Sequence, residues 1–213
     1  MCSILRRSFF VLLAAAILVL SSCSGVDKAE ADFVDSIRVA VATDKGLPAD
    51  YDSMHSLIDG AKPNLIFYGT VTERGECFYE NGNDGAILTP YSIAVNEVYL
   101  GEINKAGDTM RLDARYGKIG DDSYRTTPHP IFEVGKSYVF FVRYDIINGS
   151  LIPYLASGVY GAIEANHDPD TLVFPVEGSF LDAYNGSAVA MVKEIMELVE
   201  ANEYDTSIGV IGE

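Results

Sequence analysis

Tryptophan is absent from this 213-residue chain, and cysteine and basic residues are scarce. Three cysteines are too few for a disulfide framework, so the fold must rest on a hydrophobic core. Fifteen Lys and Arg stand against 31 Asp and Glu, for a formal net charge of −16. Basic side chains that neutralise phosphates dominate nucleic-acid binding, so this balance argues against a nucleic-acid partner. High net charge by itself favours solubility.

The first 22 residues have the pattern of an export signal. Arg6 and Arg7 are followed by an uninterrupted apolar run from Phe9 to Leu20. The run is shorter than the roughly 20 residues of a membrane-spanning helix, and it fits the roughly 7 to 15 residues of a signal-peptide core. The sequence therefore predicts that residues 1–22 are a signal peptide.

The segment Leu20-Ser21-Ser22-Cys23 resembles the lipobox of bacterial lipoproteins. The resemblance implies that a peptidase cuts before Cys23, and that Cys23 carries acyl chains such as palmitate. These would anchor the protein to the cell membrane or outer envelope on the extracytoplasmic side; one chain binds only marginally, whereas two or three make a durable anchor. An ordinary secretory signal and an uncleaved anchor are the alternatives. Arg6-Arg7-Ser8-Phe9-Phe10 also resembles part of a twin-arginine signal, but its usual later Lys is absent, so the export route stays open.

Removal of the signal peptide changes both the charge and the cysteine count. The mature chain keeps 13 Lys and Arg against 31 Asp and Glu, a formal charge of about −18. Anionic lipid headgroups repel such a chain, so the acyl groups would hold it at the membrane unaided. An acylated Cys23 cannot pair with Cys77, and about 190 residues suffice for one domain with its own core.

The mature chain divides into a tether, residues 23–32, and a single globular domain, residues 33–213. The tether consists of small and polar residues. Residues 37–43 fit either a strand or a short helix. Apolar residues at three- and four-residue spacings predict a helix from Pro48 to Ala61 and a C-terminal helix over residues 187–202.

Between these helices the pattern changes to that of β-strands. Apolar runs predict strands at residues 65–72, 91–100, 110–116, 138–147, 151–156, 159–165 and 171–176. Gly69 predicts a bend or a close backbone approach. The apolar face changes parity near Asn96 and Glu97, which predicts a β-bulge. Asn148-Gly149 predicts a tight hairpin turn, and the Gly and Pro residues of segment 117–131 predict a long loop.

Three of these segments resemble the netrin-like and TIMP-like OB-fold modules, a pattern that bacterial surface lipoproteins share. They are Ile66–Val71, Tyr91–Gly101 and Phe132–Phe141, the last of which contains Gly135-Lys136-Ser137-Tyr138 like the Gly-x-x-Tyr strand of those modules. The resemblance covers residues 64–165. It implies a mainly β fold: a closed, five- to six-stranded OB-like Greek-key barrel over residues 64–176, with one helix before it and one at the C-terminal end. Such barrels serve as binding modules.

Cys77 is the candidate nucleophile of the mature chain. A catalytic thiolate needs a nearby cation, a His or a helix N-terminus, whereas Glu76 and Glu80 flank Cys77. His55, His129 or His167 could approach it in the fold. An idle or buried thiol is the simpler interpretation.

Metal binding finds weak support in the residue spacings. His129, His167, Asp168 and Asp170 are ligand types without a known zinc spacing, and the loop Asn81–Gly85 lacks the calcium-loop pattern. TIMP-like inhibitors chelate zinc through a free N-terminal Cys, which an acylated Cys23 cannot supply. No metal and no cofactor are therefore predicted.

Two further patterns concern the surface. Asn148-Gly149-Ser150 and Asn185-Gly186-Ser187 match the glycosylation sequon, although a turn explains each of them better. The chain has 13 Tyr and 10 Phe, and Tyr116, Tyr124 and the loop Pro128-His129-Pro130 could rim a ligand face.

These patterns assign one site residue, the lipidated Cys23, and no catalytic residue. They predict a membrane-anchored envelope lipoprotein that acts as a non-enzymatic binding module for a protein or a small ligand. The alternative is an envelope enzyme whose carboxylate pair is hidden among the 31 acidic residues. A cleft holding two carboxylates with perturbed pKa values would favour the enzyme, and an exposed apolar patch would favour the binding module.

Overall fold

The computed structural model describes residues 28–37, 44–45, 51–82, 85–127, 129–158, 160–165, 172–173 and 179–211. The chain divides into two compact units, Met1–Val39 and Ala40–Glu213. In the first unit residues 28–37 are helical, so the predicted tether is helical from residue 28 onward. Cys23 and the predicted signal peptide lie outside the described residues. Within the described ranges, no helix has both the length and the apolarity to cross a membrane.

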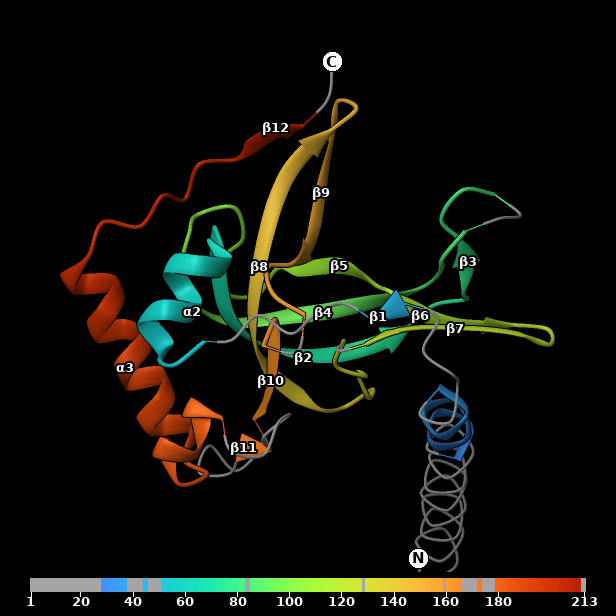
Figure 1. Cartoon of the computed structure of the whole chain (residues 1–213), viewed down its shortest axis with the longest axis horizontal. Coiled ribbons are helices and arrows are strands. Elements are labelled where there is room, and N and C mark those ends of the chain that lie inside the picture. Colours follow the sequence, from blue (N-terminus) through green and yellow to red (C-terminus); the bar gives the residue numbers. More distant parts are fainter. Residues whose placement is uncertain are drawn as a thin grey trace, which may run out of the picture. The chain divides into compact units, whose positions relative to one another are not determined.

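The second unit is built mainly of β-strands (Figure 1). Its larger sheet contains β2 (Leu65–Arg74), β3 (Phe78–Tyr79), β4 (Ile87–Leu100), β5 (Thr109–Ala114), β8 (Ser137–Ile147), β9 (Ser150–Leu155), β10 (Ala162–Ala165), β11 (Leu172–Val173) and β12 (Gly209–Ile211). The strand order is β11-β10-β8-β2-β4-β3, with β5 added to β4 and with β9 and β12 added to β8. Neighbours are antiparallel except β12, which runs parallel to β8.

β8 is the central strand because its first half is apolar on both faces. Residues 137–142 are all buried, and they pair with β2 on one side and with β10 on the other. Val139 and Phe141 belong to the core beneath the helices. Phe140 stacks on Phe67 of β2 with ring centroids 4.9 Å apart, and it also contacts the ring of Phe132. A strand with this composition needs cover on both faces, as predicted for residues 138–147.

The predicted β-bulge is present in β4. Tyr68 pairs with Glu97 and the next residue, Gly69, pairs with Val95, so Asn96 is the extra residue. A Cβ on Gly69 would lie 2.7 Å from the Phe67 ring and 2.9 Å from the Ala94 carbonyl oxygen. The close backbone approach that was predicted at Gly69 is therefore confirmed.

The larger sheet does not form the expected closed barrel in the residues that the structure describes. β5 and β9 end the strand path β5-β4-β2-β8-β9 and lie near each other, but no ladder joins them. Pro153, in the middle of β9, has no amide hydrogen to donate, and Pro inside a sheet is confined to edge strands. This agrees with β9 as an edge strand, and the seam between β5 and β9 is open in the described residues.

The prediction of a long loop at residues 117–131 is wrong, because most of this segment is a β-hairpin. β6 (Tyr116–Ile119) pairs antiparallel with β7 (Asp122–Thr127), and β1 (Asp44–Lys45) adds to β7 in parallel. Gly120 has φ +59° in the two-residue turn. The strands are polar, so apolar alternation does not reveal them, and the glycine marks a tight turn instead of a loop.

Helices pack on one face of the larger sheet (Figure 1). α2 (Met54–Ala61) starts later than predicted because Ser53 caps it, its Oγ accepting from the Ser56 amide at 3.1 Å. The short 3₁₀ helix η1 (Phe180–Tyr184) precedes α3 (Ala188–Ala201), which matches the predicted C-terminal helix. The expected mainly β fold with a helix before the strands and one near the C-terminus is confirmed.

Candidate functional site

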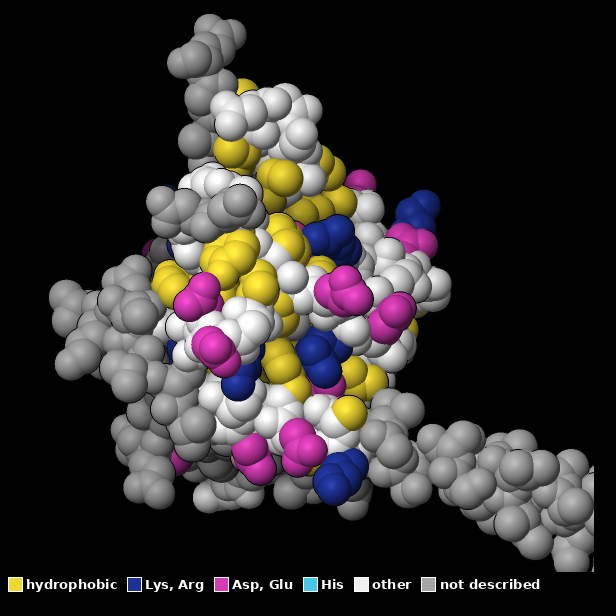
Figure 2. Space-filling view, turned by 90° about the vertical axis from the view of Figure 1, so that its right-hand side faces the viewer, with side chains coloured by type: hydrophobic (Ala, Val, Ile, Leu, Met, Phe, Trp, Pro, Cys, Tyr) yellow, Lys and Arg dark blue, Asp and Glu magenta, His cyan; other side chains and the backbone are white. Residues whose placement is uncertain are grey.

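A groove of about 580 Å³ follows the open seam between β5 and β9, and we call it the seam groove. Its apolar wall comes from β9 and the end of β8, and its charged wall comes from β5 together with Glu80. Figure 2 views the molecule from the right-hand side of Figure 1, where β3 and the β6–β7 hairpin lie. Hydrophobic side chains run from the top of this face to its centre, with Lys, Arg, Asp and Glu side chains beside them.

The apolar wall is carried by the β8–β9 hairpin. Asn148 at φ +49° and Gly149 at φ +78° form the two-residue turn that the sequence predicted. Just beyond it, Leu151 and Ile152 are 45% and 40% exposed. Large apolar side chains this exposed on an edge strand form a contact surface that a partner can bury.

The charged wall follows from the alternation of β5. Met110, Leu112 and Ala114 are buried, so the intervening side chains and Arg115 face outward. Arg111 Nε lies 2.7 Å from Asp113 Oδ1. The Arg115 guanidinium donates to both carboxylate oxygens of Glu80, at 3.1 and 3.3 Å. Two cations and two anions therefore balance each other along this wall.

His129 lines the same groove beside Arg115. Burial and the positive charge of Arg115 lower the pKa of His129 to about 4, so its imidazole is neutral at physiological pH. The buried Nδ1 has no hydrogen-bond partner among the described residues, whereas the backbone amide of His129 donates to the Thr126 carbonyl at 3.2 Å. The groove therefore offers one polar atom that a ligand could satisfy.

The aromatic residues predicted to rim a ligand face are only partly brought together. His129 lines the seam groove, but Tyr116 is fully buried and its hydroxyl accepts from the Phe132 amide at 2.7 Å. Tyr124 is on β7, where its hydroxyl accepts from Thr126. Pro128 lies outside the described residues. The prediction for Tyr116 is wrong because its strand turns that side chain into the aromatic core.

The sulfur of Cys77 lies beside a hydroxyl and a glycine. Its Sγ lies 3.4 Å from the Thr89 hydroxyl, and a Cβ on Gly117 would lie 3.0 Å from it. His129 lines the seam groove, and His55 is next to Tyr204, with Nδ1 and Oη 3.2 Å apart. This packing agrees with an idle thiol, since a hydroxyl does not replace the cation that a reactive thiolate needs.

The remaining candidates are the possible metal ligands and the two sequon asparagines. In the described ranges no three His, Cys, Asp or Glu side chains are placed to hold a metal ion, and His167, Asp168 and Asp170 lie outside those ranges. Asn148 and Asn185 both have positive φ, as residues of tight turns do.

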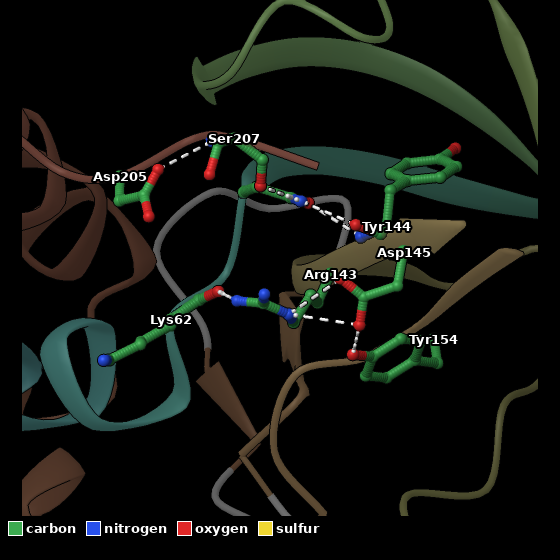
Figure 3. Close-up of polar contacts among 8 residues, drawn as sticks. Lys62, Arg143, Tyr144, Asp145, Tyr154, Asp205 and Ser207 are labelled. Atoms are coloured by element: carbon green, nitrogen blue, oxygen red, sulfur yellow. Dashed lines mark hydrogen bonds and ion pairs between the residues drawn. The ribbon is translucent and has the colours of Figure 1, made fainter. Parts of the chain in front are cut away.

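A buried polar network joins β8 and β9, and its Tyr154 also lines the seam groove (Figure 3). Asp145 of β8 is 2% exposed; it accepts from the Tyr154 hydroxyl and from Arg143 Nε, the latter at 3.2 and 3.3 Å. Burial alone would raise the pKa of Asp145, but these hydrogen bonds and the Arg143 charge outweigh it and hold that pKa below its usual value. Burial and Asp145 raise the pKa of Tyr154 to about 12. Arg143 Nη1 also donates to the Lys62 carbonyl at 3.0 Å, which ties β8 to the end of α2.

Asn64 extends this network to the C-terminal segment. Its side-chain amide donates to the carbonyls of Tyr144 and Ser207, at 2.8 and 3.2 Å, and its Oδ1 accepts from the Tyr144 amide at 2.7 Å. Figure 3 shows the bonds that join β8, β9 and the segment before β12. No sequence motif pointed to these residues, although a charge such as Asp145 inside an apolar strand is a usable signal.

Carboxyl groups with shifted pKa values bear on the enzyme alternative. Hydrogen bonds from Ser56 and Ser53 lower the pKa of Asp52, and those from Ser207 lower the pKa of Asp205, as the Tyr154 and Arg143 bonds do for Asp145. A general acid needs the opposite shift, a raised pKa.

Comparison of the chain with protein-family models, curated proteins and solved structures finds no match.

Proposed function

We propose that this chain is an exported lipoprotein, anchored by acyl groups on Cys23, that binds a protein partner in the seam groove. The observation that carries the proposal is the open seam itself. There the exposed Leu151 and Ile152 line the groove together with a wall on which charges of both signs are already paired. An apolar centre with a polar margin is the arrangement of protein–protein interfaces.

The energetics favour apolar contact as the source of affinity. Full burial of a Leu or Ile side chain contributes about 1.5 to 3 kcal/mol, so burying the remaining exposed part of each contributes about 1 kcal/mol. Exposed ion pairs contribute about 0.2 to 1 kcal/mol, so Arg111 and Asp113 act mainly on orientation. Backbone pairing is a weak contributor, because Pro153 leaves a gap in the donors of the β9 edge.

The groove can be tested by photo-crosslinking in intact envelopes. A photoreactive amino acid at Ile152 of the lipidated protein should give a discrete protein adduct. The same amino acid at Met196, which is 51% exposed on α3, is the matched control and should not give that adduct. Arg111→Glu should weaken the Ile152 adduct by reversing one charge of the wall. Identical adducts from both positions would reject the groove as the binding face.

The anchor is tested separately. Cells grown with an alkyne-tagged palmitate should label the wild-type chain and the Cys77→Ala variant but not the Cys23→Ala variant. Label that persists in Cys23→Ala would contradict lipidation at this residue without bearing on the seam groove.

A further inference from the structure

A second groove, of about 680 Å³, lies between α3 and the larger sheet, and we call it the helix groove. On the helix side it is lined by Val189, Val192 and Met196, which recur at three- and four-residue spacings along one face of α3. Val189 and Met196 are each 51% exposed. Ala188, Met191 and Ile195 are the buried core residues of α3, and Val192 packs against the same core, so Val189 and Met196 are the members of this stripe that stay exposed.

The sheet side of the helix groove presents two tyrosines around a glutamate. Tyr68 of β2 pairs directly with Glu97 of β4, and Tyr99 follows two residues after Glu97, so the three side chains share one face of the sheet. The Tyr99 hydroxyl donates to Glu97 Oε2 at 3.2 Å. Burial and the Glu97 charge raise the pKa of Tyr99, so its ring stays neutral and electron-rich beside a carboxylate.

The charges of the helix groove are not balanced. Glu97, Glu197 and Glu200 line it, and Lys193 is the one basic lining residue in the part of the chain that the structure describes. The Lys193 ammonium lies 3.5 Å from Glu197 Oε1, so its charge is shared with that carboxylate. Glu97 and Glu200 have no basic neighbour among the described lining residues. The groove therefore attracts a cation, in contrast to the seam groove.

We infer that the helix groove binds an amphiphilic organic cation, a small molecule with an apolar body and one ammonium group. The apolar body would lie along Val189, Val192 and Met196. The ammonium would lie at Glu97, between the rings of Tyr68 and Tyr99, because aromatic faces attract cations and a carboxylate adds its charge. The volume is that of a small-molecule site. This inference does not depend on the proposed function, which uses a different face.

The three probes share a hexyl chain and differ in the charge of the head group. They are hexyltrimethylammonium, its uncharged carbon isostere with a tert-butyl group in place of the trimethylammonium, and hexyl sulfate. Each is titrated calorimetrically into the full chain in lipid nanodiscs, with empty nanodiscs as the blank. We expect saturable binding of the ammonium, binding of the isostere about tenfold weaker, and no binding of the sulfate.

Matched variants separate the groove from the general acidity of the chain. Glu97→Gln keeps an oxygen that can accept from Tyr99, and it should weaken ammonium binding about tenfold. Met196→Gln should weaken it about fivefold by removing apolar contact. Glu203→Gln, exposed and outside the groove, and Leu151→Gln, in the seam groove, should leave it unchanged.

Three outcomes would overturn the inference. Equal binding of all three probes would show unselective apolar contact. Equal weakening by Glu97→Gln and Glu203→Gln would show attraction by bulk charge alone. A wild-type dimer that Met196→Gln dissociates, without ammonium binding, would assign the helix groove to a second copy of the chain.

Discussion

Replacing Asp145 with Asn tests whether the buried network holds the β8–β9 hairpin and the C-terminal strand together. Asp145 is 2% exposed, and its carboxylate accepts from Arg143, from Tyr154 and from the backbone of Gly209 in β12. Asn keeps one acceptor oxygen but removes the charge that neutralises Arg143. The variant leaves a partly buried guanidinium without its partner.

The expected cost follows from the exposure of the two groups. Removing one partner of a fully buried ion pair costs about 3 to 5 kcal/mol. Arg143 is 29% exposed, so water recovers part of this loss, and we expect Asp145→Asn to lower the free energy of unfolding by about 2 to 3 kcal/mol. Asp113→Asn is the matched control, because its pair with Arg111 is 33% and 63% exposed and contributes about 1 kcal/mol or less.

Urea unfolding of the non-acylated mature chain measures both variants, and its pH dependence tests the mechanism. The pKa of Asp145 is lowered in the folded state, so its contribution is complete above the unfolded value of 3.8 and is lost as the pH falls through the folded pKa. The difference between wild type and Asp145→Asn should therefore be constant near neutral pH and shrink below about pH 4. Hydrogen exchange should also rise at residues 209–211 in the variant.

Equal losses in Asp145→Asn and Asp113→Asn would refute this reasoning, because burial would then make no difference. A stability difference that persists unchanged well below pH 4 would refute it as well, since the lost interaction would not be that of a carboxylate.

Three further predictions concern the sheet and the seam groove. Gly69→Ala should destabilise the fold by about 1 to 3 kcal/mol, because its Cβ meets the Phe67 ring and the Ala94 carbonyl, whereas Gly60→Ala in α2 meets only the Tyr51 ring and should be near neutral in the same urea assay. His129 should titrate near pH 4 by NMR, and Arg115→Gln should raise that pKa. Because the pKa of His129 is lowered in the folded state, the free energy of unfolding should fall as the pH drops from about 6.5 to 4. If His129→Gln keeps the wild-type dependence of stability on pH in this range, the prediction is contradicted. Pro153→Val restores an amide donor to the β9 edge and should increase self-association measured by light scattering, and unchanged scattering would argue that Pro153 does not protect this edge.

The local sequence pattern was sufficient to predict an element wherever the residues of that segment carry the signal themselves. The two-sided apolar run of residues 138–147, the change of parity at Asn96, the Asn148-Gly149 turn and the stripe of α3 each depend on neighbours in sequence. The hairpin of β6 and β7 was missed because its strands are polar and its stability depends on pairing rather than on an apolar face. Lipidation of Cys23 rests on the signal segment alone and stays a prediction.

The sequence by itself determined most of the apolar strands and the two predicted helices, because side-chain periodicity and turn chemistry act over a few residues. The tertiary structure decided which segments meet. The seam groove joins Glu80, Arg111 and Ile152, the network joins Asn64 to Asp145, and the helix groove joins Tyr68 to Met196. These groups lie far apart along the chain, and strand order and register alone bring them within reach. One residue links the two levels: Pro153 is visible in the sequence, but only the strand order shows that it lies on an edge strand beside the open seam.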